Sequence, residues 1–476
     1  MVSTGLPNAI VTGIVTGSIV AMGGIGLALV YSIAEVPNFA HGDLLMIGAY
    51  IALFVNKPGT VPVFELLATG ERALSAPGVA VLFVLTAGSF LGMVYLLDGR
   101  EALFGSWWPS RPSPTIGIGV HLIVAVLLGA IVVVGMPSIW VSVLLAALLL
   151  SVLAPLTERI VFGKFRAQDA TLATMLIASL GVSFILRFGT QAVYGGAARI
   201  YSVPSTVDVV GSTFYITAAK FFDLYVAGGV VVRIIDTGPE GNATVATIDY
   251  SSVVIAAVIV GTTILAVAGY YWRRRVAGDR VDLTLGPRLA AAIFGVLGFL
   301  ALAFLLGSPG SVPEEYAYAT RFRLFPIKSL IVLIAIGMMA VLHLLLQETK
   351  LGTAMRASSD NLDLAKVTGI NTDRVMMATW ILAGLFAGIA GVMLGISLSR
   401  VQVNIGFFLL LPMFAAVILG GIRSVYGVIL GAYVVGIAMD VGFTVLPVGN
   451  EFRVPIAFIV LVIVLLIKPE GLVGGS

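Results

Sequence analysis

Residues 348–374 read ETKLGTAMRASSDNLDLAKVTGINTDR and form a polar stretch between two long apolar segments. The stretch carries eight charged side chains: Glu348, Lys350, Arg356, Asp360, Asp363, Lys366, Asp373 and Arg374. Placing one charge at the centre of a bilayer costs about 2.5–3.5 kcal/mol on insertion scales, so eight of them exclude this stretch from the membrane. This stretch, the 348–374 loop, is therefore expected to lie in water between two membrane spans.

The composition of the chain places it in the membrane. Of its 476 residues 59% are hydrophobic and 11% are charged, whereas about 25% are charged in a soluble domain. A soluble fold cannot bury so much apolar surface, and the sequence predicts an all-α polytopic membrane protein. The chain has no cysteine, which excludes disulfides and thiolate chemistry, and its net charge of +3 gives no sign of nucleic-acid binding.

Apolar runs predict about 11–13 transmembrane helices. Two runs, 39–56 and 403–421, are short and contain polar residues, so they are expected to be broken or re-entrant. The runs lie near 9–33, 39–56, 77–97, 116–136, 138–158, 171–190, 251–272, 288–307, 327–347, 374–396, 403–421, 425–446 and 452–468.

The basic residues predict the orientation in a cell membrane. If the 348–374 loop is cytoplasmic, the loops on its side hold lysine and arginine at roughly twice the density of the other side. This orientation places the N-terminus outside and the C-terminus in the cytoplasm. The longest soluble stretch, 191–250, is then extracellular, and its runs FYITAAKFF and VAGGVVVRIID are typical of short strands.

The 348–374 loop itself contains a predicted short helix over about 360–368. Ser358 or Ser359 can cap its start, and Gly369 can end it. A helix this short is not stable alone in water. It is either part of an ordinary solvated connector or a docking helix for a cytoplasmic partner.

Asn38-Phe-Ala-His-Gly-Asp43 is a second polar motif, beside the short run 39–56. Polar groups near a membrane boundary are costly and suggest function. A metal site would need more ligands than His41 and Asp43, because the other histidines, His121 and His343, lie in distant spans. A hydrolase would need a nucleophile elbow, which is missing. Helix capping or a place on a transport path remain as interpretations.

Several motifs together resemble one family. RASSDNLDLAKVTGINTDRV at 356–375 resembles the cytoplasmic coupling loop of permease subunits of branched-chain amino acid importers of the ATP-binding-cassette class. The family also shows an NFAHG-acid-MIGAY signature, an ER segment before a span, an AVLGG stretch and a KPEGLVG ending, which are similar to residues 38–50, 158–182, 412–433 and 468–474. The resemblance covers 9–56, 138–205 and 326–473.

The resemblance implies a single permease domain over residues 1–476, with a core extended by two inserted helix pairs at 57–137 and 217–325. It also implies that the 348–374 loop is the coupling loop that docks on a separate ATPase. The chain lacks a phosphate-binding loop of its own, so it would be no enzyme and hold no cofactor or metal; ATP and Mg²⁺ would bind the partner ATPase. Further implied partners are a second homologous permease, an extracytoplasmic substrate-binding protein and the lipid bilayer.

Two sets of candidate site residues follow. Polar residues predicted to line the substrate pathway can meet an amino acid zwitterion without permanent net charge: Asn38, His41, Asp43, Gln402 and Asn404. The residues matching the family's coupling motif are Ala357, Asp360, Ala365, Gly369, Ile370 and Asn371.

Other functions stay open at this stage. The same architecture would suit a permease for urea or short amides. An ion-coupled secondary transporter would need acidic residues deep in its spans, for which Asp440 and Asp43 are the candidates. An intramembrane enzyme is disfavoured because a nucleophile–base pair is missing.

Overall fold

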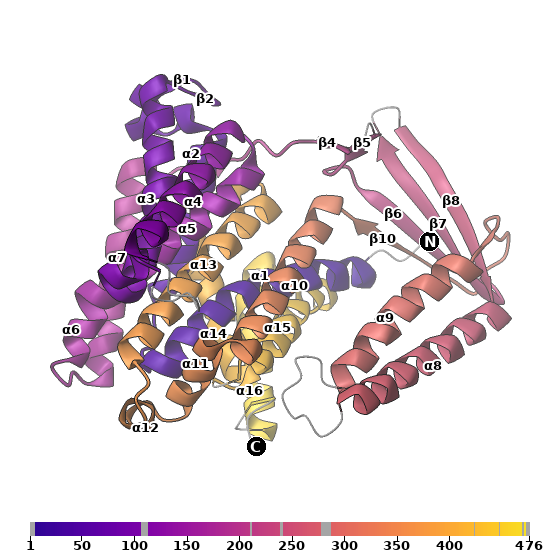
Figure 1. Ribbon diagram of the computed structural model, residues 1–476. Helices are drawn as coiled ribbons and strands as arrows, with labels where there is room; N and C mark the ends of the chain where they lie inside the picture. Colours follow the sequence, from indigo (N-terminus) through magenta and orange to yellow (C-terminus); the bar gives the residue numbers. More distant parts are fainter. Residues whose placement is uncertain are drawn as a thin grey trace. The chain divides into compact units, whose positions relative to one another are not determined.

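The computed structural model describes residues 5–105, 113–209, 212–238, 241–277, 287–422, 424–446, 448–468 and 471–472. The chain divides into two compact units: residues 1–11, 205–329 and 343–349 form the smaller one, and 12–204, 330–342 and 350–476 the larger one. Figure 1 labels the elements. Helices α1 (Gly5–Ala34) and α10 (Pro326–Glu348) contribute residues to both units.

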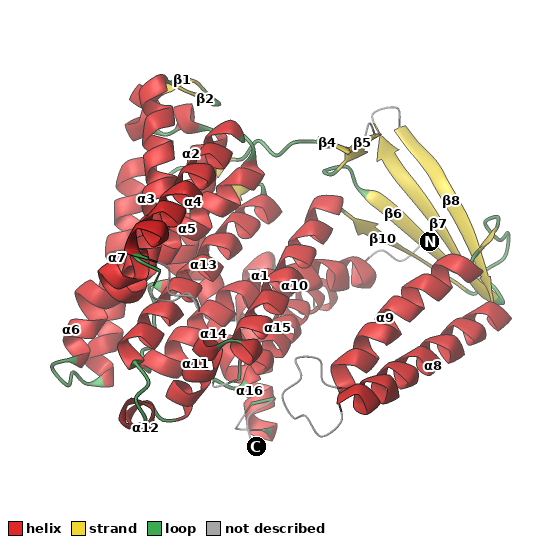
Figure 2. Cartoon of the chain, in the orientation of Figure 1, coloured by secondary structure: helices red, strands yellow, loops and turns green. Residues whose placement is uncertain are grey.

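The larger unit is helical (Figure 2). Its remaining helices are α2 (His41–Asn56), α3 (Ala76–Leu103), α4 (Pro114–Val134), α5 (Ile139–Thr157), α6 (Gly163–Arg166), α7 (Leu172–Tyr194), α11 (Lys350–Asp360), α12 (Leu362–Val367), α13 (Thr372–Leu398), α14 (Ile405–Gly420), α15 (Val425–Val445) and α16 (Arg453–Ile467). A π-helical turn, η3 (Glu158–Phe162), joins α5 to α6. Short 3-10 turns are η1 (Pro58–Thr60), η2 (Pro62–Leu67) and η4 (Asn450–Phe452), and the strand pairs are β1 (Ala68–Gly70) with β2 (Ala73–Leu74) and β3 (Arg199–Ile200) with β11 (Arg400–Val401).

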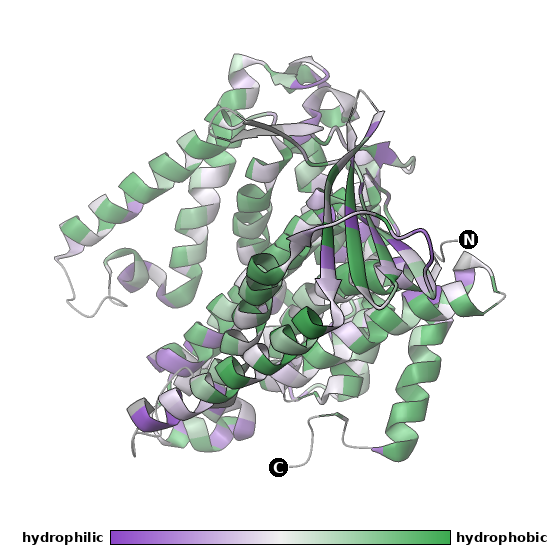
Figure 3. Ribbon diagram, turned by 90° about the vertical axis from the view of Figure 1, so that its right-hand side faces the viewer, coloured by the Kyte–Doolittle hydropathy of each residue, from purple (hydrophilic) through white to green (hydrophobic). Residues whose placement is uncertain are grey.

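The helices confirm a polytopic membrane protein. Among the described residues nine helices are long and apolar enough to cross a bilayer, and four more are apolar but shorter. Figure 3 shows hydrophobic residues over most turns of the long helices. The short runs predicted at 39–56 and 403–421 form α2 and α14, of 16 residues each. At 1.5 Å per residue each is about 24 Å long, less than the roughly 30 Å hydrocarbon core.

Helix α13 packs through glycines against α5 and α2. A Cβ at Gly384 would lie 2.0 Å from the Leu150 carbonyl oxygen of α5, and one at Gly391 would lie 1.9 Å from the Leu45 carbonyl oxygen of α2. Such contact is possible only without side chains, and it compensates for the weak hydrophobic drive between helices in lipid. The start of α2 meets the start of α14 in the same way, with Gly42 against Gly406.

The smaller unit contains a five-stranded antiparallel sheet of order β10-β6-β7-β8-β9 and the helix pair α8 (Ser252–Ala277) and α9 (Pro287–Leu306). The strands are β6 (Lys220–Val226), β7 (Gly229–Gly238), β8 (Gly241–Ser251), β9 (Ser308–Pro309) and β10 (Tyr318–Leu324); β4 (Thr206–Val209) pairs with β5 (Ser212–Tyr215) separately. The strand-like runs within 191–250 are confirmed. Strand β10, after the helix pair, completes the sheet by pairing with β6.

A buried aspartate fixes the register of that sheet. Asp223 of β6 is fully buried and is bound by arginines from both neighbouring strands: Arg233 Nη2 lies 2.6 Å and Arg321 Nη2 2.8 Å from its Oδ2. Burial alone would raise the pKa of Asp223, but the hydrogen bonds and charges of the two arginines outweigh it and hold the pKa below its usual value. Asp223 therefore stays ionised and ties three strands together.

Candidate functional site

The 348–374 loop folds into two short helices, α11 and α12, that precede α13. The predicted helix over 360–368 is confirmed in place, but its cap is corrected. The α12 helix begins at Leu362, and the Oδ1 atom of Asn361 accepts a hydrogen bond from the Leu364 N–H at 2.9 Å. Ser358 and Ser359 cannot cap α12 because they belong to the last turn of α11.

Gly369 ends α12, as predicted. Its φ of +88° lies in the left-handed region that favours glycine. The Ile370 N–H donates to the Ala365 carbonyl at 3.1 Å, and the Gly369 N–H to the Lys366 carbonyl at 3.1 Å, which together form a Schellman motif. Asn371 then caps α13 by accepting a hydrogen bond from the Arg374 N–H. The chain between α12 and α13 is thus fixed by its own backbone hydrogen bonds and by the Asn371 side chain.

The faces of α12 differ sharply in exposure. Leu364 and Val367 are 61% and 85% exposed, whereas Ala365 is 3% exposed and packs inward. The residues Asp360, Gly369 and Asn371 are also exposed, and Ala357 and Ile370 are half-buried. The sequence motif therefore mixes surface residues with residues that shape the helix. Leu364 and Val367, which are not among the six predicted coupling residues, provide the exposed apolar surface.

The start of α2 holds three predicted pathway residues, Asn38, His41 and Asp43, all fully buried. Asn38 Oδ1 accepts a hydrogen bond from the Ala40 N–H at 3.0 Å, and His41 Nε2 lies 2.9 Å from the Gly23 carbonyl oxygen. The carbonyl can only accept, so Nε2 carries the proton. Asn38 Nδ2 and His41 Nδ1 have no hydrogen-bond partner among the described residues. Asn38 therefore holds a buried donor without a partner and His41, three residues later, a buried acceptor without one.

Asp43 forms a buried ion pair that the sequence motif does not reveal. Arg187 of α7 donates from Nε to Asp43 Oδ1 at 2.9 Å and from Nη2 to Oδ2 at 3.2 Å, and Ser183 donates to the same carboxylate. The Arg187 guanidinium also lies 4.7 Å from the Phe407 ring centroid. Ser183 and Arg187 are one helical turn apart and so share a face of α7. A serine and an arginine four apart in an apolar span are the signal that could have pointed to this partner.

Gln402 and Asn404 lie in the turn that precedes α14. Gln402 is half-buried and Asn404 is exposed, so their surroundings differ from those of the fully buried α2 residues. Their chain approaches α2 through the Gly42–Gly406 contact. The structure thus brings the irregular starts of α2 and α14 together, while no direct contact joins Gln402 or Asn404 to Asn38, His41 or Asp43 among the interactions described.

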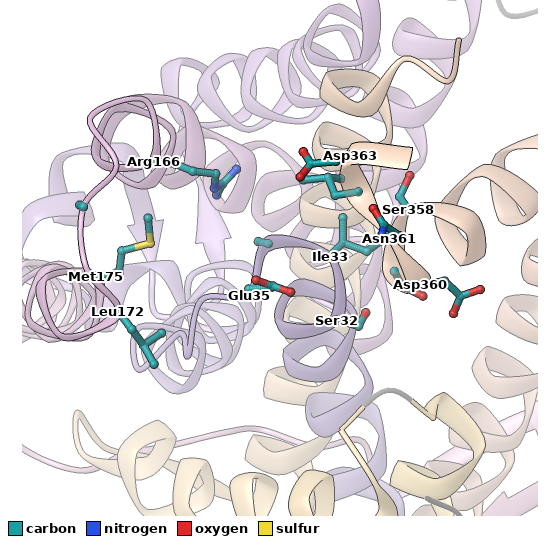
Figure 4. Close-up of a pocket in the computed structure, with 14 residues that line it drawn as sticks. Ser32, Ile33, Glu35, Arg166, Leu172, Met175, Ser358, Asp360, Asn361 and Asp363 are labelled. Atoms are coloured by element: carbon teal, nitrogen blue, oxygen red, sulfur yellow. The ribbon is translucent and has the colours of Figure 1, made fainter. Parts of the chain in front are cut away.

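A pocket of about 490 Å³ lies beside the 348–374 loop. The residues that line it come from the end of α1, the α6–α7 segment and the α11–α12 junction (Figure 4): Ser32, Ile33, Ala34, Glu35, Arg166, Ala170, Leu172, Met175, Ser358, Ser359, Asp360, Asn361, Leu362 and Asp363. A second pocket of about 500 Å³ lies between η3, α12 and the start of α13. The helices α11 and α12 of the 348–374 loop therefore line pockets and are not packed on all sides by the rest of the protein.

Two further observations bear on other chemistries. Within the described part of the chain, no group of three or more histidine, aspartate or glutamate residues is placed to hold a metal ion. Asp440 of α15 is paired with Arg453, and Thr16 donates to its other oxygen at 2.8 Å. Asp440 therefore joins α1, α15 and α16.

In the stretch 412–433, Ser424 caps α15 by accepting a hydrogen bond from the Gly427 N–H. Arg423 itself lies outside the described residues, as do most residues of the KPEGLVG ending.

The many apolar helices define the class of a polytopic membrane protein. The family described as "Branched-chain amino acid transport system / permease component" matches residues 9–104 and 224–465, and the chain belongs to this family. The matched ranges do not mark insertions, so the boundaries 57–137 and 217–325 stay predictions.

Relatives of known name agree with this assignment. The chain is 27% identical to the probable branched-chain amino acid transport permease protein LivH of Methanocaldococcus jannaschii, over 65% of this chain and 92% of that protein. It is 35% identical to the high-affinity LivH permease of Escherichia coli K12, over 29% of this chain and 44% of that protein. It is also 27% identical to the xylose transport system permease protein XylH of Haemophilus influenzae, over 49% of this chain and 62% of that protein. No solved structure matches the chain.

Proposed function

We propose that this chain is the membrane-spanning permease of an ATP-driven importer that moves branched-chain amino acids or related small polar solutes. Energy comes from a separate ATPase that binds ATP and Mg²⁺ and docks on the 348–374 loop. A second homologous permease completes the pathway, and a substrate-binding protein delivers solute on the opposite side. In this proposal the loop and the C-terminus are cytoplasmic and the N-terminus is outside.

The exposed apolar pair of α12 carries the proposal. An isolated six-residue helix is not stable in water. The α12 helix is nevertheless capped at both ends, and its Leu364 and Val367 side chains are exposed to solvent. A short amphipathic helix that lays its apolar side chains in a groove is a common mode of protein recognition. This surface suits docking on a cytoplasmic subunit better than it suits a solvated connector.

For the pathway, the support lies at the irregular starts of α2 and α14. Non-helical backbone at membrane depth is tolerated only where protein buries it or where it lines a watery cavity. Within the described part of the chain, Asn38 and His41 hold there a buried donor and a buried acceptor without partners, the two kinds of group that a zwitterionic solute needs. We place the solute path beside this segment, with Asn38, His41, Asp43, Gln402 and Asn404 as its candidate lining.

A permease for urea or short amides uses the same architecture, and the resemblance to a xylose permease widens the range of solutes further. The relatives named for branched-chain amino acids favour that class. An ion-coupled secondary transporter is less well supported, because the acidic residues it would use, Asp43 and Asp440, are each neutralised by an arginine.

The docking proposal is tested by assembly of the permease with its ATPase. We expect the double change Leu364→Ala with Val367→Ala to weaken binding of the purified ATPase by at least about tenfold, the effect of losing a small apolar anchor. Binding is measured by surface plasmon resonance with the permease in nanodiscs. These side chains are exposed, so the thermal stability of the isolated permease should not change.

Leu66→Ala is the matched control. Leu66 is 91% exposed in η2, in a segment predicted to lie on the opposite side of the membrane, and its truncation should leave ATPase binding unchanged. Wild-type ATPase affinity in the Leu364 and Val367 variant would contradict docking through α12. Unchanged amino acid uptake by vesicles carrying Asn38→Ala and by those carrying His41→Ala would remove these residues from the pathway.

A further inference from the structure

The pocket of about 490 Å³ lies where α1 and α11 both end. We propose that this α1–α11 pocket receives a lysine or arginine side chain of the ATPase subunit. The inference rests on the proposed function, because it assumes that an ATPase docks on the 348–374 loop. It adds a second contact between the two subunits. In the first, α12 of the permease binds in a groove on the ATPase; in the second, a basic side chain of the ATPase binds in the permease pocket.

Two helix C-termini converge on the pocket. Its lining includes the last three residues of α1, Ser32–Ala34, and the last three of α11, Ser358–Asp360. The last carbonyl groups of a helix lack intrahelical partners and carry a partial negative charge that favours a cation. Neither helix has a basic residue in its last turn. Neither helix therefore supplies a cation to its own negative end.

Three carboxylates add to this negative field. Glu35, Asp360 and Asp363 line the pocket, and Figure 4 shows them on different elements around it. No ion pair to any of the three occurs among the described residues. The lining contains one cation, Arg166, which forms an ion pair with Glu158. Arg166 Nη1 lies 3.0 Å from Glu158 Oε1, and Nη2 lies 3.1 Å from Oε2. The pocket is thus left with a net negative charge.

A buried hydroxyl points to a ligand independently of the charges. Ser358 lines the pocket and is only 3% exposed, yet its Oγ has no hydrogen-bond partner among the described residues. Burying a hydroxyl without a partner has a desolvation cost that a ligand N–H group would remove. The unpaired hydroxyl therefore marks a place in the lining where a donor from a ligand would be stabilised.

A cationic side chain fits the pocket better than a metal ion. The acidic groups form no cluster that could hold a metal within the described residues, and the volume far exceeds that of one water molecule, about 30 Å³. A guanidinium spreads five donors over a planar fork, and an ammonium offers three donors on a long stem. The occupant is assigned to the ATPase because Leu362 and Asp363 of the lining belong to α12 itself. Pocket and docking helix therefore form one continuous surface.

The test measures ATPase binding as a function of salt. The complete permease in nanodiscs, carrying Glu35→Gln, Asp363→Asn or both, is titrated with the purified ATPase between about 0.05 and 0.5 M NaCl, a range over which exposed charge pairs become screened. We expect the double variant to bind about tenfold more weakly at low salt. The difference from wild type should shrink at high salt. Melting temperatures of each variant without ATPase show that folding is intact, and the single variants decide the question if the double variant unfolds.

Asp373→Asn is the control that matches the single variant Asp363→Asn in charge. Asp373 is exposed in the first turn of α13, in the same loop but outside the lining of this pocket, and its neutralisation should leave the salt dependence as in wild type. The pocket proposal is overturned if the double variant binds the ATPase with the affinity and salt dependence of Asp373→Asn. It is also overturned if the carboxylates bind a soluble polyamine, seen as a shift in melting temperature with spermidine, while ATPase affinity is unchanged.

The outcomes separate this inference from the proposed function. Weak binding by the Leu364 and Val367 variant, with normal binding by the Glu35 and Asp363 variant, rejects the pocket and retains the docking helix. Normal binding by the Leu364 and Val367 variant rejects the proposed docking itself.

Discussion

Asp43 and Asp363 both lie in the first turn of a helix, the position where a carboxylate complements the helix dipole. Asp43 in α2 is fully buried and bound by Arg187 and Ser183, whereas Asp363 in α12 is exposed and has no ion pair within the described residues. The charge of Asp43 is neutralised within the chain, whereas that of Asp363 is not neutralised by any described residue. The comparison teaches where to look for partners: a carboxylate paired inside the chain supports the fold, whereas an exposed one such as Asp363 is open to a group from outside.

The largest expected effect comes from breaking the buried pair. Removing one member of a buried ion pair leaves an uncompensated charge and costs about 3–5 kcal/mol. We expect Arg187→Gln to destabilise the permease by this amount because Asp43 is left buried alone. Asp43→Asn with Arg187→Gln should cost clearly less than the sum of the two single changes. Thermal unfolding of all four proteins in the same detergent measures this coupling, and additive effects would show that the pair does not act as a unit.

Asp223 in the sheet sharpens the comparison, since it is a buried and paired aspartate outside the spans. Its pKa is lowered in the folded protein, so the unfolded state binds its proton at a higher pH than the folded state does. The stabilisation is complete above the unfolded value of about 3.9 and is lost as pH falls through the lowered folded value. We expect amide protection in β6 and β10 to decline in that acidic window, measured by hydrogen exchange and corrected for intrinsic rates. In Asp223→Asn the same amides should show little further decline from this group.

The 348–374 loop should depend on its backbone turns rather than on its charges. Gly369 has a φ of +88°, and a side chain in the left-handed region costs about 1–2 kcal/mol. We expect Gly369→Ala to loosen α12 by this amount, seen as faster hydrogen exchange at residues 364–370. Asp363→Asn is the comparison, because it removes a charge and leaves the turn intact. Equal loss of protection in both variants would contradict the distinction.

The smallest effect concerns the cap of α12. Asn361→Ala removes the side-chain acceptor for the Leu364 N–H, which typically costs about 1 kcal/mol. The same change at Asn371 removes the corresponding cap of α13, a helix of 27 residues packed among glycine contacts. Hydrogen exchange in the two first turns should therefore respond strongly to Asn361→Ala and weakly to Asn371→Ala.

Local signals in the sequence predicted the loop well. The charges place it in water, and the order Gly369-Ile370-Asn371 predicts where α12 ends. The helix start was misplaced by a few residues because Ser358, Ser359 and Asn361 are all good caps, and the choice depends on how far α11 extends. Such a choice is settled by packing, which the sequence of the loop alone does not contain.

Long-range pairings were beyond sequence reasoning. Asp43 and Arg187 are 144 residues apart, and Asp223 and Arg321 are 98 apart. Asp43 was visible as a polar residue beside an apolar run, but nothing local identifies the arginine that neutralises it, and the role of Asp223 was not visible at all. The strand β10 was missed for the same reason. Its seven residues follow a helix pair, and they form a strand by pairing with β6, which lies about 100 residues earlier in the chain.

The short link between α12 and α13 has a mechanical consequence. Residues 368–371 are held by hydrogen bonds from Thr368, Gly369 and Ile370 back to α12, and by the Asn371 cap on α13. Residues 368–371 cannot change conformation in response to a force on α12 without breaking those hydrogen bonds. The force passes into α13, a rod of about 40 Å at 1.5 Å per residue, whose glycine face touches α5 and α2. The joint would thus transmit a push on α12 to the buried segment around Asn38 and His41.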